Sequence, residues 1–483
     1  MQTLHRSILA VAVLASCECA RGVAQAPGTP SDSARRAIDA LYSPYAHSGS
    51  PGCATGVFQN GAVTFSRGYG FADLNHDVPI TPATRFTVGS VSKQFTAASI
   101  ALLAQSGRIS LDDDVRQYVP ELPSYQAPVT IRHLVYHTSG VRDFWELVTL
   151  AGWRPDDGYT SDDMVNLATH QKGLNFAPGA EYRYSNTGYL LLATVIKRVT
   201  RQSLRAFADS AIFRPLGMRE TIFLDDHTEI VARRAPAYAP ARNGWRIDVW
   251  NNDIVGQGGI VTSIADLQKW DENFYDAKVG GKDFIAQLQI PGHITAPGPM
   301  TYAFGLTIET YRGMRLVQHT GATGGYRAAI YRFPEAHTSV AMLCNASTAN
   351  TGQLALRMAD IVLADRFTVP AERVVVSERG GGRGAQPGGP SRPALQRDAA
   401  LGRFRSDELL GAVWEITAGD ASDRIVVRRA RGEPDVLAAD EKWLSFSGRG
   451  ITLFYDSAVN GKSAGFVVNG SRVSGLRFER VVP

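Results

Sequence analysis

The chain has 483 residues, of which 44% are hydrophobic and 20% are charged, so its composition is that of an ordinary globular protein. This length allows one large core or several smaller ones, and we expect two domains with flanking segments. The formal net charge is only +4, and Lys and Arg are scattered along the chain, so the sequence predicts no nucleic-acid partner.

The N-terminus has the pattern of a secretory signal. A positively charged start precedes the apolar run Ser7–Ala15, which is too short to span a bilayer. Two processing sites compete: Ala-Gln-Ala at 24–26 suits ordinary cleavage, whereas Leu-Ala-Ser-Cys at 14–17 resembles a bacterial lipobox. We therefore expect an exported protein, in the periplasm, secreted or held in the envelope, that loses residues 1–26 or carries a lipid anchor on Cys17.

Cysteine usage excludes a disulfide framework. Cys17 and Cys19 fall within the signal region, which leaves Cys53 and Cys344 in the body of the chain. Both lie in apolar, strand-like stretches, where they could pair in an oxidising compartment or remain buried thiols. Neither has metal-ligating neighbours in the sequence.

The region from residue 33 to 376 predicts a domain with one antiparallel sheet and a helical region. Its sheet begins with a hairpin, because Asn60-Gly61 lies between two apolar runs, which is the strongest local hairpin signal. Apolar periodicity predicts two helices and three later strands. The helices are about 90–106 and 188–199, and the strands are 314–317, 328–333 and 339–344.

A stretch at 377–394 is dense in Gly and Pro, with almost nothing to bury, and is predicted to be a linker. Beyond it, residues 395–483 contain short alternating runs separated by turns such as Asn460-Gly461 and Asn469-Gly470. We expect a small all-β barrel domain. It could pack on a catalytic cleft, mediate homo-oligomer formation, or only stabilise the chain.

The first chemical motif is Ser90-Val-Ser-Lys93, preceded by Gly89 and followed by a helix-like run. The spacing places Ser90 at a helix start with Lys93 one turn later, on the same face. A serine hydroxyl is a weak nucleophile at neutral pH, and a neighbouring amine with a pKa lowered by burial can accept its proton. Alone, the motif also fits a solvated helix start.

Two further motifs follow in chain order, Tyr184-Ser-Asn186 and His319-Thr320-Gly321. Together the three elements resemble the S-x-x-K, Y-x-N and K/H-T-G motifs of serine β-lactamases and penicillin-binding proteins, in the class C and DD-peptidase branch. The resemblance covers about residues 33–373. It implies a β-lactamase/transpeptidase-like α/β (α+β) fold, and the C-terminal region resembles the lipocalin-like domains appended to some of these enzymes.

The resemblance implies a role for each motif residue. Ser90 would attack a carbonyl carbon, Lys93 and Tyr184 would manage its proton, and Asn186 would hold the substrate's amide carbonyl. The sequence does not decide whether Lys93 or Tyr184 is the base. The backbone N–H groups of Ser90 and Ala322 would form the oxyanion hole. Substrate would also contact a second group of residues, namely His319, Thr320 and Gly321.

His319 departs from the lysine that β-lactamases and DD-carboxypeptidases commonly carry at this position. Histidine is mostly neutral at pH 7, and H-T-G elements resemble those of D-aminopeptidases and some esterases of the superfamily. We therefore expect an exported serine hydrolase that acts on small peptides or amides, such as a D-amino-acid or cell-wall peptidase. An esterase and a β-lactamase are the alternatives, in that order, and a slowly turning over acylated sensor is the alternative from another class.

Other chemistries find no support. His133 and His137 are four residues apart but lack the glutamate of H-E-x-x-H, so no metal is predicted. The chain also lacks a G-x-S-x-G elbow, a phosphate-binding loop and a dinucleotide motif, so we predict no cofactor.

Overall fold

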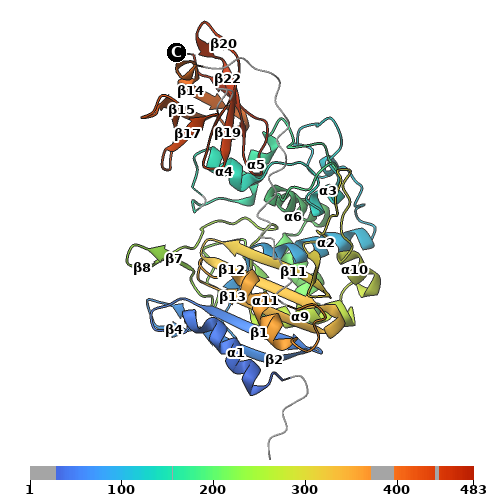
Figure 1. Ribbon diagram of the computed structural model, residues 1–483. Coiled ribbons are helices and arrows are strands. Elements are labelled where there is room, and N and C mark those ends of the chain that lie inside the picture. Colours follow the sequence, from blue (N-terminus) through green and yellow to red (C-terminus); the bar gives the residue numbers. More distant parts are fainter. Residues whose placement is uncertain (1–28, 155, 371–395, 441–444, 483) are drawn as a thin grey trace, which may run out of the picture.

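The computed structural model describes residues 29–154, 156–370, 396–440 and 445–482. The predicted signal segment with Cys17, and the predicted linker at 377–394, lie outside these ranges. Figure 1 shows a large α/β body with a smaller β body above it. No helix in the described ranges has the length and apolar character needed to cross a membrane.

The large body is organised around a six-stranded antiparallel sheet with the order β10-β11-β12-β13-β1-β2. The predicted hairpin is present, and its turn residues Asn60 and Gly61 both have positive φ (49° and 78°), the backbone that an Asn-Gly hairpin turn needs. The strands of this sheet are β1 (Cys53–Gln59), β2 (Ala62–Tyr69), β10 (Thr307–Tyr311), β11 (Met314–Thr323), β12 (Tyr326–Phe333) and β13 (Thr338–Cys344).

Strand alternation divides the sheet's side chains between two cores. In β13, Met342 and Cys344 face one core with helices α1 (Asp32–Tyr42) and α11 (Thr351–Val362), whereas Leu343 faces the other. This second core joins the sheet to α9 (Ile264–Asp276) and the helical region. Covering both faces explains why β13 is apolar at nearly every position.

Cys53 and Cys344 form a disulfide in the structure. The sequence left pairing and free thiols as alternatives. Register decides between them, because Cys53 of β1 and Cys344 of β13 lie directly opposite each other in an antiparallel ladder. Both side chains are fully buried on the α1 and α11 side of the sheet.

In the helical region, α2 (Lys93–Gln105) packs against α6 (Asn186–Thr200). These are the two helices that the sequence predicted. The α-helix begins at Lys93, after a 3₁₀ turn, η2 (Gly89–Ser92), that holds Ser90. Around this pair lie α3 (Ile131–Val135), α4 (Phe144–Leu150), α5 (Ser161–Thr169), α7 (Leu204–Ala208), α8 (Arg214–Leu216) and α10 (Gly281–Leu288).

Short elements complete the large body. The small strands are β3 (Phe71–Asp73), β4 (Val78–Pro79), β5 (Phe86–Thr87), β6 (Ile222–Phe223), β7 (Tyr238–Ala241), β8 (Gly244–Ile247) and β9 (Ile260–Thr262). The short helical turns are η1 (Ser43–Tyr45), η3 (Val115–Gln117), η4 (Asp209–Phe213, a π-helical turn) and η5 (Pro334–Ala336).

The C-terminal body is a closed barrel of eight strands, which confirms the predicted barrel. Its interior is filled by fully buried aromatic rings, among them Phe404, Trp414, Phe466 and Phe478. The strands are β14 (Gly402–Ser406), β15 (Ala412–Ala418), β16 (Arg424–Arg428), β17 (Asp435–Ala439), β18 (Phe446–Gly448), β19 (Ile451–Tyr455), β22 (Gly465–Asn469) and β23 (Leu476–Arg480). Helix α12 (Arg397–Ala400), turn η7 (Asp407–Leu409) and the hairpin β20 (Ala458–Val459) and β21 (Lys462–Ser463) accompany them.

The barrel shares a core with the large body. One cluster of buried side chains runs from Phe144 and Leu147 of α4 and Met164 of α5 into the barrel interior. Trp414 Nε1 donates a hydrogen bond of 2.7 Å to the carbonyl of Leu150, at the end of α4. Figure 1 shows the barrel standing directly over α4 and α5. The barrel therefore packs against the large body through apolar side chains.

A buried ion pair crosses the same interface. Arg142 Nη1 lies 2.6 Å from Glu408 Oε2, and the two side chains are only 3% and 5% exposed. Glu408 Oε2 also accepts a hydrogen bond from Lys172 N, and Arg142 Nε donates one to the carbonyl of Ser474. Such a pair is costly to break, because removing one partner leaves the other charge buried.

We expect Glu408→Ala to lower the free energy of unfolding by about 3–5 kcal/mol, because Arg142 would lose its carboxylate in a buried site. The measurement is the urea unfolding midpoint of the full chain. The matched control is Glu121→Ala, which breaks a half-exposed pair with Arg198 and should cost under about 1 kcal/mol. Equal midpoints for the two variants would contradict this account of the interface.

Candidate active site

The three sequence motifs meet in one large cleft of about 1570 Å³. Ser90 comes from η2, Tyr184 and Asn186 from the start of α6, and His319 to Ala322 from β11. The sequence predicted a strand ending at Val317, but β11 continues to Thr323. The apolar pattern stops earlier because this end of the strand borders the cleft.

Two glycines let β11 approach the turn that carries Ser90. Gly89 has φ +51°, and a Cβ on it would lie 2.6 Å from the backbone nitrogen of Ala322. A Cβ on Gly321 would lie 2.0 Å from the carbonyl oxygen of Val88. Any side chain at either position would push the strand away. The backbone nitrogens of Ser90 and Ala322, predicted to form the oxyanion hole, are thereby held on the same side of the cleft.

Lys93 lies fully buried beneath Ser90. Its Nζ is 3.0 Å from Ser90 Oγ, 3.0 Å from Asn186 Oδ1 and 2.6 Å from the carbonyl oxygen of Gln257. Burial lowers the pKa of Lys93 well below its usual value, with a smaller opposing effect from the charge of Asp143. The structure thus provides the amine with a lowered pKa that the motif requires.

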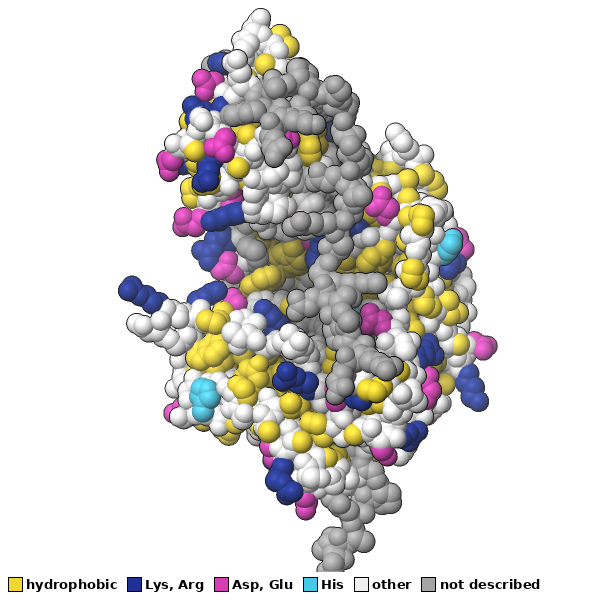
Figure 2. All heavy atoms as spheres, viewed as in Figure 1, with side chains coloured by type: hydrophobic (Ala, Val, Ile, Leu, Met, Phe, Trp, Pro, Cys, Tyr) yellow, Lys and Arg dark blue, Asp and Glu magenta, His cyan; other side chains and the backbone are white. Residues whose placement is uncertain are grey.

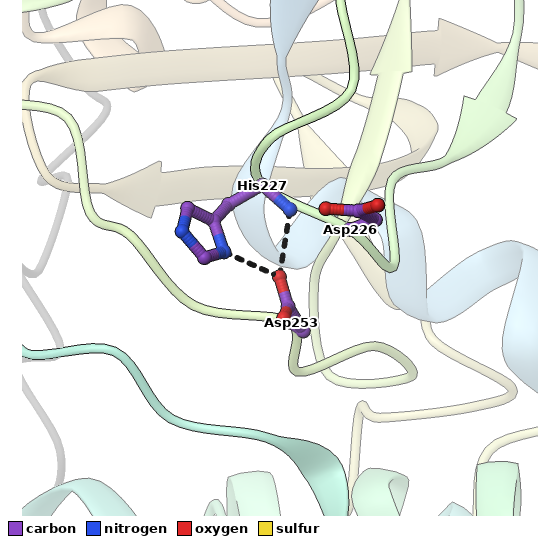
Figure 3. A group of neighbouring side chains, drawn as sticks. All are labelled: Asp226, His227 and Asp253. Carbon is purple, nitrogen blue, oxygen red and sulfur yellow. Dashed lines mark hydrogen bonds and ion pairs between the residues drawn. The ribbon is translucent and has the colours of Figure 1, made fainter.

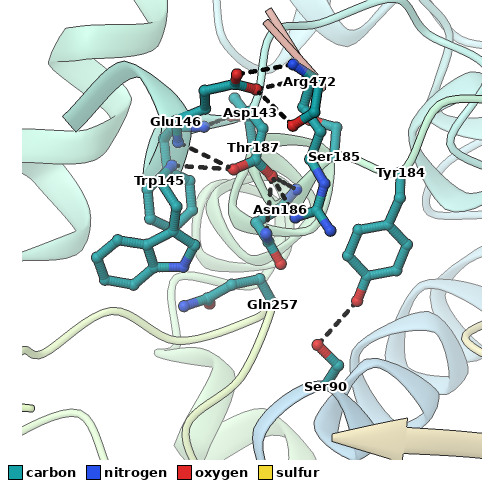
Figure 4. A network of polar contacts seen from close by, with 12 residues as sticks. Ser90, Asp143, Trp145, Glu146, Tyr184, Ser185, Asn186, Thr187, Gln257 and Arg472 are labelled. Carbon is teal, nitrogen blue, oxygen red and sulfur yellow. Dashed lines mark hydrogen bonds and ion pairs between the residues drawn. The ribbon is translucent and has the colours of Figure 1, made fainter. Parts of the chain in front are cut away.

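Tyr184 lies on the other side of Ser90. Its hydroxyl donates a hydrogen bond of 2.8 Å to Ser90 Oγ, as Figure 4 shows. Burial raises the pKa of Tyr184, and the hydrogen bond to Ser90 opposes this only in part. Tyr184 therefore keeps its proton at neutral pH. The ring of His137 packs against it, with centroids 4.3 Å apart, so this histidine has a packing role.

Asn186 is oriented by Asp143, a residue that the sequence analysis missed. Asp143 Oδ2 accepts hydrogen bonds of 2.7 Å from both the backbone nitrogen and Nδ2 of Asn186. Its other oxygen caps α4 by accepting from the backbone nitrogens of Trp145 and Glu146. Asn186 Oδ1 accepts from Lys93, so the amide has one remaining hydrogen. Figure 4 shows the Asn186 side chain beside Asp143. The Asp-x-x-Glu capping pattern at 143–146 was the available signal.

Gln257 is a second lining residue without a sequence prediction. Its side chain is 6% exposed, and Oε1 has no hydrogen-bond partner among the residues that the structure describes. A buried acceptor without a partner is costly. Because Gln257 lines the cleft, this oxygen is available to an N–H group of a substrate.

His319 is held as a neutral ring. Its Nδ1 donates to the carbonyl oxygen of Thr320 at 2.5 Å, which leaves Nε2 to accept from the hydroxyl of Tyr302 at 3.1 Å. Burial, with the nearby charge of Lys93 as the smaller cause, lowers the pKa of His319 to about 4. The residue supplies no positive charge at pH 7. Thr320 and Gly321 follow it along the cleft wall.

We expect the stability of the protein to fall as the pH drops from about 6.5 to about 4. Across this range the unfolded chain takes up a proton at His319 that the folded chain cannot, which favours unfolding. His319→Gln should remove this part of the loss, up to about 3 kcal/mol. The measurement is the unfolding midpoint as a function of pH. Replacing the exposed His47 with Gln should leave the profile unchanged, and an unchanged profile in His319→Gln would contradict the prediction.

A polar cluster at the rim of the cleft consists of Asp226, His227 and Asp253, shown in Figure 3. Asp253 Oδ1 accepts from both the backbone nitrogen and Nδ1 of His227, at 2.7 and 2.9 Å. The cluster is largely exposed. The hydrogen bonds account for the contact between His227 and Asp253, whereas Asp226 Oδ1 accepts from the backbone nitrogen and the hydroxyl of Thr228. The cluster ties together two segments that line the cleft near Leu224 and Ile254.

The barrel contributes the last part of the cleft wall, through Ser471 and Arg472. The carboxylate of Glu146 accepts hydrogen bonds from their backbone nitrogens, at 2.9 and 2.5 Å. The Arg472 guanidinium carbon lies 5.1 Å from the centre of the Tyr184 ring. The sequence offered no reason to place a barrel residue beside the nucleophile, because the contact joins positions about 290 residues apart.

Comparisons with known proteins agree with this geometry. The family model described as Beta-lactamase matches residues 38–364. The D-aminopeptidase of Cereibacter sphaeroides is 31% identical over 324 residues, and that of Brucella canis is 31% identical over 320 residues. Each match covers 65% of this chain and 60% of the relative, so the chain matches about three fifths of the relatives' length.

Two solved structures have a similar fold. The octameric penicillin-binding protein homologue from Pyrococcus abyssi aligns with a TM-score of 0.61 at 23% identity, over 89% of this chain and 95% of that one. The D-amino acid amidase from Ochrobactrum anthropi SV3, solved with D-phenylalanine, aligns with a TM-score of 0.57 at 22% identity, over 69% and 100%. At these identities the likeness concerns the fold.

Proposed function

Because the chain belongs to the beta-lactamase family of serine hydrolases, we propose that it hydrolyses an amide bond that follows a D-residue, through an acyl-enzyme on Ser90. The observation that carries this proposal is the pair of contacts on the nucleophile. Ser90 Oγ lies 3.0 Å from the Lys93 amine and 2.8 Å from the Tyr184 hydroxyl. These are the nucleophile and proton-handling groups that covalent catalysis requires.

A count of hydrogens supports Lys93 as the base. A neutral amine has two N–H groups, and Lys93 has an acceptor for each of them, Asn186 Oδ1 and the carbonyl oxygen of Gln257. The lone pair of the amine is then directed at Ser90 Oγ. Tyr184 donates its own hydrogen to the same oxygen, so the single hydrogen of Ser90 points to Lys93. The lowered pKa of Lys93 and the raised pKa of Tyr184 agree with this assignment.

Acylation then follows from the geometry. As Ser90 Oγ bonds to the carbonyl carbon, its proton passes to Lys93, and the backbone N–H groups of Ser90 and Ala322 stabilise the oxyanion. When the C–N bond breaks, Tyr184 gives its proton to the leaving amine, and the proton that Lys93 took from Ser90 passes to the Tyr184 oxygen, which leaves both groups as they were before acylation. A water molecule attacks the resulting ester, gives its proton to the same pair of groups, and releases Ser90 with its hydrogen.

The relatives support the substrate class. They bear the name D-aminopeptidase, and one solved structure of the same fold holds D-phenylalanine in a D-amino acid amidase. The remaining Asn186 hydrogen can hold the carbonyl of the acyl donor. His319 is neutral and gives no charge to a substrate carboxylate, which favours an amidase over a β-lactamase.

The experiment is intact-mass detection of the acyl-enzyme, with turnover rates, on a panel of substrates. The panel holds D- and L-phenylalanine p-nitroanilides, a D-alanyl dipeptide, a p-nitrophenyl ester and nitrocefin. We expect the D-anilide to be cleaved fastest, with many turnovers per enzyme. Equal rates for the two enantiomers would contradict D-selectivity, faster ester or nitrocefin turnover would favour those alternatives, and a single turnover would favour the sensor.

We also propose that the protein is exported, on the basis of the signal pattern in residues 1–26. The Cys53–Cys344 disulfide suits an oxidising compartment. The mass of the N-terminal peptide of the purified protein distinguishes cleavage after Ala26 from a lipid on Cys17, and an intact Met1 would contradict export. Oligomer formation through the barrel stays a prediction.

A further inference from the structure

The segment 470–475 between β22 and β23, here called the barrel loop, reaches from the barrel into the cleft. Two side chains of the large body, Glu146 and Asn175, fix its backbone by hydrogen bonds. Glu146 binds the nitrogens of Ser471 and Arg472, and Asn175 Nδ2 donates 2.8 Å to the carbonyl of Arg472. Asn175 Oδ1 also accepts from the backbone nitrogen of Ser474 at 2.7 Å. The loop backbone is therefore already ordered before substrate binds, so only the Arg472 side chain has to be ordered on binding.

The side chain of Arg472 has unused hydrogen-bonding capacity. Its Nη1 lies 3.8 Å from Asp143 Oδ2, an oxygen that already accepts two hydrogen bonds from Asn186. No hydrogen bond from the guanidinium to any part of the described chain is present, and the side chain is 42% exposed. A guanidinium has five N–H donors, and its geometry matches a carboxylate. Figure 4 shows Arg472 above Asn186, and the guanidinium carbon lies 5.1 Å from the centre of the Tyr184 ring.

The charges around the cleft favour an anion as well. Its described lining contains four arginines, which are Arg183, Arg234, Arg327 and Arg472, and one acid, Glu309. On the molecular face in Figure 2, by contrast, basic and acidic side chains are interspersed. A cleft whose lining carries an excess of one sign of charge attracts ligands of the opposite sign.

We propose that Arg472 is a substrate-binding residue that selects an acyl donor with a carboxylate close to the scissile amide. This inference rests on the proposed function, because it takes Asn186 as the group that holds the acyl donor's amide. A free α-ammonium in the same place would be repelled by Arg472. The preferred substrate therefore carries an anionic group on its acyl part, which distinguishes this enzyme from one that requires a free amino terminus.

The first test measures binding without turnover, in the full-length Ser90→Ala protein. The ligands are N-succinyl- and N-acetyl-D-phenylalanine amide, which differ in one carboxylate. We expect the succinyl ligand to bind at least about tenfold more tightly, since a hydrogen bond to a charged group contributes that much or more. Adding Arg472→Ala should remove the difference, Arg472→Lys should keep part of it, and Arg472→Glu should reverse it.

Arg428→Ala is the matched control, because Arg428 is an exposed arginine on β16 of the same barrel. It should keep the preference for the succinyl ligand. Arg472→Ala retains the backbone nitrogen that Glu146 binds and loses a long ion pair of 3.8 Å with Asp143, so its unfolding midpoint should fall only slightly below that of the parent. Equal affinity for the two ligands, or a preference that survives Arg472→Ala, would overturn the proposal.

The second test measures kcat/KM for the corresponding p-nitroanilides with Ser90 intact. We expect the order succinyl, acetyl, free amine, with a loss of about 10- to 100-fold for the succinyl substrate in Arg472→Ala and about threefold or less for the acetyl substrate. If no anilide were turned over but the succinyl ligand still bound more tightly than the acetyl ligand, the proposed function would be rejected and the role of Arg472 in binding would stand. The two leaving-group ligands N-acetyl-D-phenylalanyl-glycine and N-acetyl-D-phenylalanyl-glycinamide differ in a carboxylate after the scissile amide. If Arg472 favoured the glycine compound and gave no preference for the succinyl ligand, the assignment of the carboxylate to the acyl part of the substrate would be overturned.

Discussion

Replacing Ser90 with alanine is expected to reduce kcat/KM for the preferred amide by about 10⁴- to 10⁶-fold. The expected loss is this large because, in the proposed mechanism, the hydroxyl oxygen forms the acyl-enzyme, and the neighbouring groups cannot act without it. Ser90 is half-buried, and among the described residues its Oγ forms hydrogen bonds only with Lys93 and Tyr184, so the fold should be retained.

Two measurements check this result. One is kcat/KM, and the other is covalent labelling by a fluorescent phosphonate, which should disappear in Ser90→Ala. The matched control is Ser66→Ala, at an exposed serine on β2, which should keep both activity and labelling. Labelling of Ser90→Ala at the wild-type level would reject Ser90 as the nucleophile and the acyl-enzyme route with it.

Replacing Lys93 with methionine is expected to reduce kcat/KM by about 10²- to 10⁴-fold, the usual contribution of a general base. Methionine is a long, unbranched side chain, so it fills most of the space of the buried lysine without its amine. The loss should affect amides and activated esters alike, because both need a deprotonated Ser90. In the wild type, kcat/KM should rise with pH as Lys93 loses its proton, and this rise should be absent in the variant.

Tyr184→Phe provides the comparison that separates the two proton-handling groups. If Tyr184 protonates the leaving amine, its loss should harm amide hydrolysis much more than hydrolysis of a p-nitrophenyl ester, because p-nitrophenolate leaves without a proton. The measurement is the ratio of kcat/KM for the two substrates in each variant. Equal losses on the ester in Tyr184→Phe and Lys93→Met would contradict the assignment of Lys93 as the base.

The sequence was sufficient to predict the fold and the motif residues that meet in the cleft. Three motifs in a fixed chain order indicated the family, and the structure brings Ser90, Lys93, Tyr184 and Asn186 within hydrogen-bonding contact. Local patterns also predicted the Asn60-Gly61 hairpin and the barrel, because turn chemistry and strand alternation are properties of neighbouring residues.

The remaining parts of the site depend on contacts between distant segments. Asp143 orients Asn186 across 43 residues, and Glu146 holds Arg472 across 326. Nothing near Arg472 in the sequence distinguishes it from the other arginines of the barrel. Pairing of Cys53 with Cys344 likewise depended on strand register, which apolar runs alone do not specify when both faces of a strand are buried.

The core shared by α4, α5 and the barrel has a consequence for when the enzyme becomes active. A chain is synthesised from its N-terminus, so Ser90, Lys93 and Tyr184 emerge long before the barrel loop. Until the last strands form, the apolar faces of α4 and α5 lack their partners, and the cleft lacks Arg472. The order of synthesis therefore delays completion of the cleft until the barrel has folded, and a chain that stops early would have Ser90 in a cleft that lacks the barrel loop.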